Sequence, residues 1–389
     1  MSEEIPQAAR RLRIGMLAPV SWPVPPEGYG PWELVVANLT EELVARGHRV
    51  ILYAAAGSKT SAELVETVPH AFSLWPPEDR EAPEQLDPQS GLLTGPPNFR
   101  VLEQQHIAIC MEAAAGGKFD LVHSHLHVHS MVFSRLIPCP MLFTLHGAAW
   151  ARAIHPVLER YREQPVVSLS EAERRFKPDL NYVGTIPNGI RLDRFPLCRE
   201  KDDFLLFAGR LAPEKGAAEA VEIARRTGRR LRMVGMIEPK YAEYFARRIK
   251  PHLDGRQIEY LGMLSQEALA REYQRAAAVV FPTTWAEPCG MVALEAMACG
   301  TPILGSRSGY LVELVEEGRT GFLFDTLDEA VRGVDRLAVI RPEDCRARIE
   351  SRHSAAAMTD AYERIYYQLM NQRKAEGGRR KAEETAQGP

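Results

Sequence analysis

The sequence predicts an α/β protein of two domains, each built on a parallel sheet covered by helices on both faces. Short β-branched runs alternate with helical patterns along the chain, which is typical of repeated strand–helix–strand units. The 389 residues, 45% of them hydrophobic, are enough for two cores, because a domain usually holds ~100 to 200 residues. A polar segment near the middle separates two such series of strands.

The first series opens with a strand, a loop rich in proline and glycine, and an amphipathic helix. RIGMLAPV, residues 13–20, has the pattern of a buried strand. A helix is expected over about 31–46, ended by Gly47 before the strand RVILYAA. Together these form one Rossmann-like unit. Further strands, each followed by a loop that can carry site residues, are expected at FDLVHSH, PMLFTLHG, VVSLS and YVGTIPNG.

A domain boundary is expected between Gly189 and Asp203, where a polar segment precedes a new hydrophobic strand. The second series of strands is expected at FLLFAGR, LRMVG, IEYLG, AAVVFPT, PILGS and GFLF. The tail is charged and nearly free of large apolar residues, so it is expected to be disordered. The predicted divisions are domains at 1–190 and 204–340, helices at 341–373 and a disordered tail at 374–389.

The composition indicates a small-molecule partner. Lys+Arg 48 against Asp+Glu 51 gives a net charge of −3, with no basic block before the C-terminus, which argues against a nucleic-acid surface. No apolar run approaches the ~20 residues that span a bilayer, and the N-terminus has no apolar signal-peptide core. A cytoplasmic protein without a transmembrane segment is therefore expected. Six cysteines without a C-x-x-C pair are expected to be reduced thiols.

Two strand–helix junctions are candidates for binding phosphate, because helix N-termini offer free N–H groups at the carboxyl ends of parallel strands. In PEGYGPWE, Gly30 precedes a helix that starts at Pro31, but this is no G-x-G-x-x-G fingerprint. In FAGRLAPEKG, Gly209 and Arg210 end a strand and Lys215 starts a helix. These cations can hold a diphosphate, although for this segment alone a pair of surface cations that flank a turn would be favoured.

The stretch FPTTWAEPCGMVALEAMACGTPIL places two carboxylates on either side of a predicted helix start. Glu287 closes the loop after a strand. The N–H groups of Gly290, Met291 and Val292 can then bind an anion. Glu295 follows a turn later, at a suitable place to accept hydrogen bonds from a ribose diol. Two solvated carboxylates are the alternative, since such spacing is common by chance; the surrounding Pro, Gly and apolar residues make the pattern specific.

This stretch resembles the Glu, seven residues, Glu motif of the family 4 retaining glycosyltransferases (glycosyl transferases group 1), which have the GT-B fold. The likeness continues through the GYG loop, GHRV, LHG, the NG of TIPNGI and FAGRLAPEKG, and covers about residues 13–331. It implies two Rossmann-like domains facing a central cleft, with the C-terminal helix returning to the first domain. The nucleotide would be held mostly by the second domain and the acceptor by the first.

The resemblance implies transfer of a sugar from a nucleotide-diphosphate sugar to an acceptor hydroxyl with retention, without metal or cofactor. Arg210 and Lys215 match the diphosphate clamp, and Glu295 matches the ribose-binding carboxylate. Glu287 matches the carboxylate near the donor sugar, and His146 resembles the histidine that hydrogen-bonds that sugar. The expected catalytic residues are Glu287, His146, Arg210 and Lys215; the expected donor-binding residues are Gly30, Gly209, Arg210, Lys215, Gly262, Leu264, Glu287, Gly290, Met291, Val292 and Glu295.

The sequence departs from the family pattern at two places. Many relatives have a Gly-Gly pair and Pro before a Glu near the end of the site, whereas this chain runs from Gly309 through Tyr-Leu-Val to Glu313. This difference bears on the shape of the sugar and base pocket. Arg191 stands where Asp often follows Asn-Gly-Ile, which bears on the hinge.

HSHLHVH contains four alternating histidines, His123, His125, His127 and His129, which a continuing strand would place on one face, as in a metal site. No carboxylate adjoins them to orient the rings, and the segment fits a strand end that leads into a helix. No metal is therefore expected.

Several alternatives stay open. An inverting GT-B enzyme would use a first-domain base such as His146 or His125. A non-catalytic nucleotide-sugar-binding protein would keep the clamp without turnover. A phosphorylase-like enzyme is disfavoured, because the chain is short and no lysine stands out as an anchor for pyridoxal phosphate. A UDP-sugar is favoured over a GDP-sugar because UDP-sugars are the more frequent donors in the family. The sequence does not indicate whether the acceptor is a saccharide, a lipid or a natural product. The Pro-rich stretch 68–99 is expected to be an irregular excursion that shapes the acceptor site.

Overall fold

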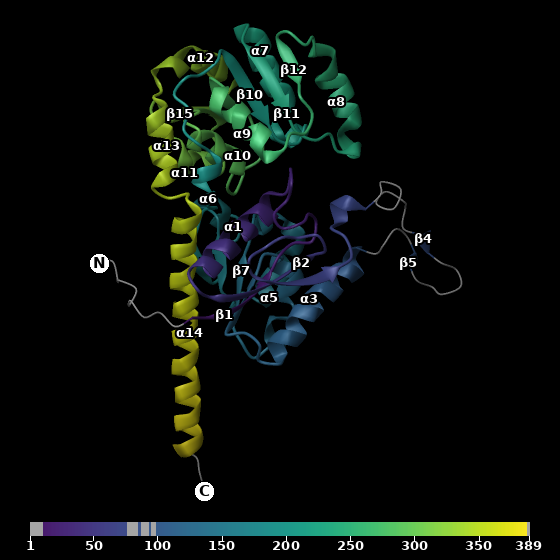
Figure 1. The fold of residues 1–389 in the computed structure, drawn as a ribbon, viewed down its shortest axis with the longest axis vertical. Coiled ribbons are helices and arrows are strands. Elements are labelled where there is room, and N and C mark those ends of the chain that lie inside the picture. The colour runs from purple at the N-terminus through teal and green to yellow at the C-terminus, as the bar shows by residue number, and fades with distance from the viewer. Residues whose placement is uncertain (1–10, 76–84, 87–92, 95–98, 387–389) are drawn as a thin grey trace. The chain divides into compact units, whose positions relative to one another are not determined.

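The computed structural model describes residues 11–75, 85–86, 93–94 and 99–386 (Figure 1). The chain forms two compact units, and each is a parallel sheet with helices packed against it, as the alternating strand and helix patterns predicted. The predicted α/β class with two Rossmann-like domains is confirmed. Unit 1 comprises Met1–Ser168, Lys177–Ile186 and Met358–Pro389, and unit 2 comprises Leu169–Phe176 and Pro187–Ala357.

Unit 1 contains a seven-stranded parallel sheet in the order β3-β2-β1-β6-β7-β8-β9. Its central strands are almost entirely buried and mostly apolar, as expected for parallel strands covered on both faces. In the register, Ile14 of β1 pairs with Val50 on one side and Leu121 on the other. The strands are β1 (Arg13–Leu17), β2 (Arg49–Ala55), β3 (Glu63–Val68), β6 (Leu121–Ser124), β7 (Met141–Thr144), β8 (Val166–Ser168) and β9 (Tyr182–Thr185).

The helices of unit 1 begin with α1, which starts at Pro31 as predicted and ends before Gly47, whose φ of 87° suits a helix stop. The core between helices and sheet is built from large buried side chains such as Tyr53 and Phe143. The helices are α1 (Pro31–Ala45), α3 (Phe99–Ala115), α4 (His127–Met131) and α5 (His155–Arg160), with 3-10 turns η1 (Phe72–Leu74), η2 (Ser134–Leu136), η3 (Ala148–Trp150) and η4 (Arg152–Ile154).

The Pro-rich stretch 68–99 is described only in part. It leaves β3 through η1, and a short antiparallel pair, β4 (Gln85–Leu86) and β5 (Leu93–Thr94), precedes α3. Residues 76–84, 87–92 and 95–98 lie outside the described residues. The expectation that this stretch shapes an acceptor site therefore stays a prediction.

Unit 2 contains a six-stranded parallel sheet in the order β12-β11-β10-β13-β14-β15. All six predicted strands are present: β10 (Phe204–Ala208), β11 (Arg230–Val234), β12 (Ile258–Tyr260), β13 (Ala278–Phe281), β14 (Ile303–Ser306) and β15 (Gly321–Phe324). The helices are α6 (Glu171–Arg174), α7 (Ala217–Thr227), α8 (Ala242–Arg248), α9 (Gln266–Arg275), α10 (Met291–Ala298), α11 (Leu311–Leu314), α12 (Leu327–Arg336) and α13 (Pro342–Glu350), with 3-10 turns η5 (Leu192–Arg194), η6 (Pro213–Lys215), η7 (Pro239–Tyr241), η8 (Lys250–His252) and η9 (Leu337–Val339).

The strand order reverses once in each sheet. In unit 1 the reversal lies between β1 and β6, and in unit 2 it lies between β10 and β13. Both sheets therefore follow the 3-2-1-4-5-6 order of doubly wound nucleotide-binding folds, in which ligands bind beyond the carboxyl ends of the strands at the reversal. These two edges are the places to look for a site.

The last helix, α14 (Ala355–Ala386, yellow in Figure 1), belongs to unit 1 from Met358 onward, as the resemblance implied. Two tyrosines carry it into the core of that unit. The Tyr366 hydroxyl lies 2.7 Å from Nδ1 of His123, and the Tyr362 hydroxyl lies 2.8 Å from Oγ1 of Thr144. None of the described helices has the length and hydropathy needed to cross a membrane.

The predicted disorder of residues 374–389 is wrong for 374–386, which continue α14. Apolar residues are few in this segment, but a helix satisfies its own backbone hydrogen bonds without them. Ala, Glu, Lys and Arg, which make up most of the segment, are strong helix formers. Residues 387–389 lie outside the described residues.

Glu363 anchors α14 to the first strand–helix unit. Nδ1 of His48 accepts a hydrogen bond from the Leu12 N–H at 3.2 Å, so Nε2 carries the ring proton and donates it to Glu363 at 2.7 Å. The guanidinium of Arg46 binds the same carboxylate and also Asp360. Glu363 is therefore the shared acceptor of two donors, and its side chain is only 11% exposed.

We expect Glu363→Ala to lower the free energy of unfolding by about 2 kcal/mol, because it leaves the buried imidazole N–H of His48 without its acceptor and removes one carboxylate from the half-buried guanidinium of Arg46. Urea unfolding followed by circular dichroism measures the loss. Asp360→Ala is the matched control: it removes another partner of Arg46, but one that is 52% exposed, so its cost should stay below about 1 kcal/mol. Equal losses in the two variants would contradict the anchoring role of Glu363.

Candidate active site

Three adjacent strands of unit 2 end on glycines with positive φ. Gly209, Gly235 and Gly262 follow β10, β11 and β12, with φ of 147°, 149° and 73°. The Gly235 N–H donates to the Gly262 carbonyl at 3.0 Å, and a Cβ added at Gly235 would lie 1.7 Å from the Gly209 carbonyl oxygen. Gly235 is therefore packed against Gly209, whereas no atom lies within 4 Å of a Cβ added at Gly209 or Gly262, so these two glycines present open backbone that a ligand can approach closely. Gly209 and Gly262 were predicted; Gly235 was missed, although the strand-then-glycine pattern recurs there in the sequence.

The turn that carries Lys215 is fixed against the loop after β13. Gly216 has φ of 73°, and a Cβ there would lie 1.9 Å from the carbonyl oxygen of Pro282. The Glu214 carbonyl accepts a hydrogen bond from the Thr284 N–H at 3.0 Å. The two loops that flank the strand reversal are therefore held in close contact.

This contact brings Lys215 to Glu287. Nζ of Lys215 lies 2.6 Å from Oε2 of Glu287, and their side chains are 16% and 14% exposed. The same ammonium lies 4.8 Å from the ring centroid of Trp285, within the range of a cation–π interaction. The structure thus unites two predicted site residues at the strand reversal. Trp285 was not predicted; its place two residues before Glu287 is the only signal for it.

The backbone of Glu287 is positioned by the segment that departs from the family pattern. The Tyr310 N–H donates to the Glu287 carbonyl at 2.8 Å. Gly309 has φ of 55°, and a Cβ there would lie 2.5 Å from both the N and the O of Glu287. The Tyr310 ring is buried, with its hydroxyl 3.1 Å from Nε2 of His353. Its bulk is accommodated in the interior of unit 2.

We expect Gly309→Ala to destabilise the protein by about 2 kcal/mol or more, because a side chain there is strained and overlaps the backbone of Glu287. Turnover should fall as well as stability, since the displaced backbone also moves the carboxylate of Glu287. Urea unfolding and initial rates measure the two effects. Gly318→Ala is the control, since φ is 73° but the nearest atom to a Cβ is 3.9 Å away. It should cost about 1 kcal/mol, and a cost as large as that of Gly309→Ala would contradict the overlap.

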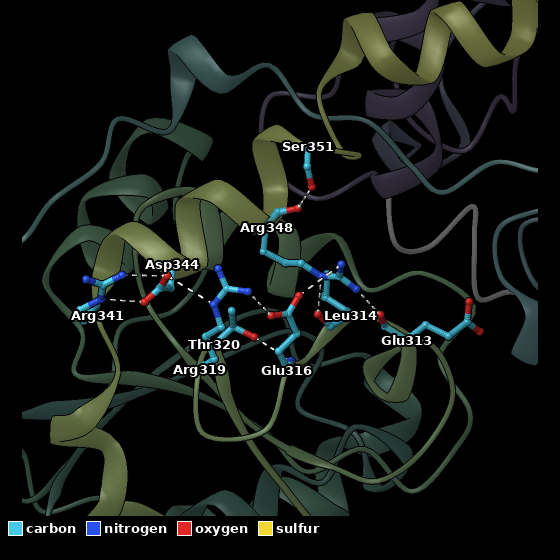
Figure 2. Close-up of polar contacts among 9 residues, drawn as sticks. All are labelled: Glu313, Leu314, Glu316, Arg319, Thr320, Arg341, Asp344, Arg348 and Ser351. Atoms are coloured by element: carbon cyan, nitrogen blue, oxygen red, sulfur yellow. Dashed lines mark hydrogen bonds and ion pairs between the residues drawn. The ribbon is translucent and has the colours of Figure 1, made fainter. Parts of the chain in front are cut away.

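Glu313, at the end of the same segment, binds the start of a neighbouring helix. Its carboxylate accepts the Ala172 N–H at 2.8 Å and the Glu171 N–H at 3.2 Å, which caps α6. Arg348 donates to the carbonyl oxygens of Glu313 and Leu314 at 2.6 and 3.0 Å, closing the end of α11. Figure 2 shows the two bonds that Arg348 donates, with the Glu313 carboxylate directed away from Arg348.

Arg210 is held between two carboxylates that were not predicted. Its guanidinium lies 2.9 Å from Glu238 and 3.1 Å from Glu214, and its side chain is 20% exposed. With Lys215 paired to Glu287, both cations of the expected clamp are balanced by carboxylates. A diphosphate that binds here would replace these ion pairs.

The helix start predicted between Glu287 and Glu295 is confirmed at Met291, with Gly290 as the N-cap of α10. A Cβ at Gly290 would lie 3.0 Å from Cζ of Phe281, so the position favours glycine. No side chain of the described residues caps this helix, and its first turn holds no acidic residue. The N–H groups of Met291 and Val292 are therefore suited to an anion.

Glu295 occupies a different environment from Glu287. It is 8% exposed, and burial raises its pKa to about 7, while the neighbouring Tyr273 hydroxyl opposes the shift. The two carboxylates thus lie in different environments, one ion-paired and one in a buried helix layer. The ribose-binding role of Glu295 stays a prediction, as does the base-binding role of Leu264, a half-buried residue just before α9.

In unit 1, Gly30 lies at the carboxyl edge next to the strand reversal, as the N-cap of α1. It has φ of 148°, and a Cβ there would lie 2.7 Å from Cβ of Pro26. Glu33, which was not predicted, is 2% exposed and accepts a hydrogen bond from the Trp22 N–H at 3.1 Å. Burial raises the pKa of Glu33 to about 7. This carboxyl fixes the loop before Gly30.

We expect the stability to depend on pH through Glu33. Because its folded-state pKa is raised above 4.5, the stability that its proton confers is lost as the pH rises from 4.5 to about 7. Glu33→Gln removes this loss, so the variant should gain about 2 to 3 kcal/mol relative to the parent between pH 5 and pH 8. Urea unfolding at both pH values tests this. Glu27→Gln, an exposed residue of the same loop, is the control, and an equal gain there would contradict the assignment.

His146, after β7, is buried and has φ of 48°. Its Nε2 lies 2.8 Å from Nδ1 of His125, and its ring stacks on Trp32 with centroids 5.4 Å apart. Burial, with smaller effects of His125 and His127, holds the pKa of His146 well below its usual range. The imidazole is therefore neutral at physiological pH.

The four alternating histidines do not share one face, because β6 ends at Ser124 and α4 starts at His127. His123 bonds Tyr366 and Thr144 in the core, and His129 pairs with Glu103 at the surface. Within the described parts of the chain, no three or more His, Cys, Asp and Glu side chains are grouped so as to hold a metal ion.

Two family models match adjoining parts of the chain. Glycosyltransferase Family 4 matches residues 33–194, and Glycosyl transferases group 1 matches residues 191–352. The glycogen synthase of Mycobacterium tuberculosis is 28% identical over 346 residues, covering 78% of this chain and 80% of that protein.

Solved structures resemble the chain over nearly its whole length. AviGT4, a glycosyltransferase involved in avilamycin A biosynthesis, is 25% identical with a TM-score of 0.66, covering 92% of this chain and 98% of its own. The Anabaena protein HepE, solved in complex with UDP-glucose, is 16% identical with a TM-score of 0.69, covering 92% of this chain and 100% of its own. The shared fold extends over both units.

Proposed function

The chain belongs to the family 4 glycosyltransferases of the GT-B fold, which act on nucleotide sugars, and we propose that it moves a sugar from a UDP-sugar to an acceptor hydroxyl with retention of anomeric configuration. The observation that carries the proposal is the Lys215–Glu287 pair at the strand reversal of unit 2, beside the free start of α10. UDP is favoured over GDP because HepE, which shares the fold, was solved with UDP-glucose.

The donor diphosphate is proposed to bind where the two cations and the start of α10 lie. Lys215 and Arg210 exchange their carboxylate partners for phosphate oxygens, and the N–H groups of Met291 and Val292 complete the site. As the glycosidic bond breaks, charge develops on the departing diphosphate and these groups stabilise it. The proposed transfer therefore needs no metal.

The two glutamates are proposed to contact different parts of the donor. Glu287, released from Lys215, faces the transferring sugar, while Glu295 accepts hydrogen bonds from the ribose hydroxyls. His146 of unit 1 hydrogen-bonds the donor sugar as a neutral imidazole, which its lowered pKa supports. The open backbone at Gly209 and Gly262 leaves room for the base and ribose.

The lowered pKa values of His125 and His146 favour retention over inversion. An inverting enzyme would need a general base, and such a base works best with a pKa near the working pH. Burial holds the pKa of both His125 and His146 well below the usual range, which makes them weak bases. In the proposed retaining reaction the leaving phosphate takes the acceptor proton. NMR of the product anomer decides between the two, and an inverted product would refute the proposal.

The proposed donor is tested by thermal stabilisation with UDP, GDP, ADP and their sugars. A ligand at a hundredfold its Kd stabilises by ~2.7 kcal/mol, which is readily measured. UDP and a UDP-sugar are expected to give the largest shifts. Hydrolysis of the UDP-sugar in the absence of acceptor would then exclude a binding protein without turnover, whereas stabilisation by GDP alone would overturn the choice of base.

A further inference from the structure

Trp32 is an exposed aromatic residue beside the candidate site of unit 1. It is the second residue of α1, directly after Gly30, and is 39% exposed. One face stacks on His146, with ring planes 24° apart, and the ring meets His127 edge-on at 5.9 Å. The two imidazoles fix the orientation of the indole while a large part of it stays open to solvent.

Three imidazole nitrogens in the histidine cluster next to Trp32 have no hydrogen-bond partner among the described residues. They are Nε2 of His125, Nδ1 of His127 and Nδ1 of His146, and each is buried from water. An unpaired buried donor or acceptor lowers the stability of the fold, so these atoms indicate a hydrogen-bond partner from outside the chain. Two of them belong to rings in contact with Trp32, and the third belongs to His125, whose ring centroid lies 5.1 Å from that of His146. Three unpaired nitrogens in one cluster indicate a ligand with several hydroxyl groups.

The backbone of this cluster is also under strain. His127 and His146 have φ of 36° and 48°, and they are the non-glycine residues with positive φ in the described parts of the chain. Such strain costs about 1 to 3 kcal/mol per residue and persists mainly at functional sites. Both residues follow strands of the sheet at its carboxyl edge, where ligands of doubly wound folds bind.

We propose that Trp32, His125, His127 and His146 form the acceptor subsite, and that the acceptor is a neutral sugar ring. The apolar C–H face of a pyranose packs on the open part of the indole, and its hydroxyls bond the free ring nitrogens. Burial lowers the pKa of all three histidines, so the four side chains offer no fixed charge to a phosphate or carboxylate. His146 is also the residue that is proposed to hydrogen-bond the donor sugar.

This inference rests on the proposed function only in calling the ligand an acceptor. Binding itself is measured by saturation-transfer NMR on the UDP-loaded protein, with methyl glucopyranosides and galactopyranosides as neutral probes. Glucose 1-phosphate represents an anionic acceptor, and a short alkyl alcohol represents a lipid. We expect a methyl pyranoside to bind with its C–H protons saturated and the other two probes to bind at least tenfold more weakly.

Substitutions then locate the site. Trp32→Ala is expected to weaken methyl pyranoside binding at least tenfold, while Trp32→Phe, which keeps an aromatic face, loses less than threefold. His127→Ala should weaken it severalfold by removing one hydroxyl partner. Val132→Ala, at a residue of unit 1 that is also 39% exposed, is the control and should bind as the parent does. Circular dichroism of each variant separates a lost contact from a lost fold.

The outcomes distinguish this inference from the proposed function. If UDP binds but no methyl pyranoside does, or if Trp32→Ala binds the pyranoside as well as the parent, the subsite is refuted and the donor proposal stands. Tighter binding of glucose 1-phosphate or of the alcohol would refute the neutral sugar as acceptor. If UDP fails to bind the parent protein, the donor proposal fails, whatever the pyranosides do.

Discussion

Lys215→Ala is expected to lower kcat by about two orders of magnitude or more, the loss found when one donor to developing charge is removed from an active site. The ammonium lies at the strand reversal of unit 2, 2.6 Å from Glu287. Its removal takes one positive charge from the leaving diphosphate and leaves a half-buried carboxylate without its cation. Arg210→Ala should cause a loss of the same order. Steady-state rates with a saturating UDP-sugar measure both.

The control for these variants is Lys240→Ala. Lys240 is 63% exposed and lies 3.4 Å from Glu238, the carboxylate that also binds Arg210. It carries the same charge in the same region without belonging to the clamp, so its removal should change kcat less than twofold. Near-normal turnover in both Lys215→Ala and Arg210→Ala would refute the clamp.

Glu287→Gln and Glu295→Gln are expected to impair different steps, the first turnover and the second donor binding. Glu287→Gln should chiefly lower kcat, because its carboxylate is proposed to face the reacting sugar. Glu295→Gln should chiefly weaken donor binding, by about tenfold, because the proposed charged acceptor for the ribose hydroxyls becomes neutral. Calorimetric titration with UDP and initial rates separate the two.

The pH dependence of donor binding provides a second readout for Glu295. Its raised pKa of about 7 means that it takes up a proton as the pH falls through 7, and the protonated form is the weaker acceptor. UDP affinity of the parent should therefore fall below pH 7, and that of Glu295→Gln should be flat there. Glu267→Gln, at a residue 87% exposed on α9, is the control. Equal changes in kcat and affinity for Glu287→Gln and Glu295→Gln would contradict two distinct roles.

The strands of unit 2 and the start of α10 were predictable because their causes are local. Continuous apolar runs mark buried parallel strands, and the Pro-Cys-Gly turn before Met291 marks a helix start. Lys215 and Glu287 were each identified by motif. Their direct contact was not, because it joins residues 72 apart and depends on Gly216 packing against a carbonyl oxygen of another loop.

Other features had no local signal. The carboxylates that hold Arg210 come from a neighbouring turn and from the loop after β11, and both resemble ordinary surface glutamates in the sequence. Trp32 and His146 are far apart in the chain, and only the parallel order of β1, β6 and β7 brings their rings together. The tail was misjudged because composition alone was weighed and helix propensity was not.

The division of unit 1 into segments constrains the order in which this protein can acquire its structure. His123 and Thr144 gain their tyrosine partners, Tyr366 and Tyr362, only after all of residues 187–357 of unit 2 have been synthesised. Ribosomes add residues from the N-terminus, and domains fold as units once their chain is available. All the residues of unit 2 are therefore synthesised before those of unit 1 are complete, although most of unit 1 comes first along the chain. The core of unit 1 lacks its last helix until α14 has been synthesised.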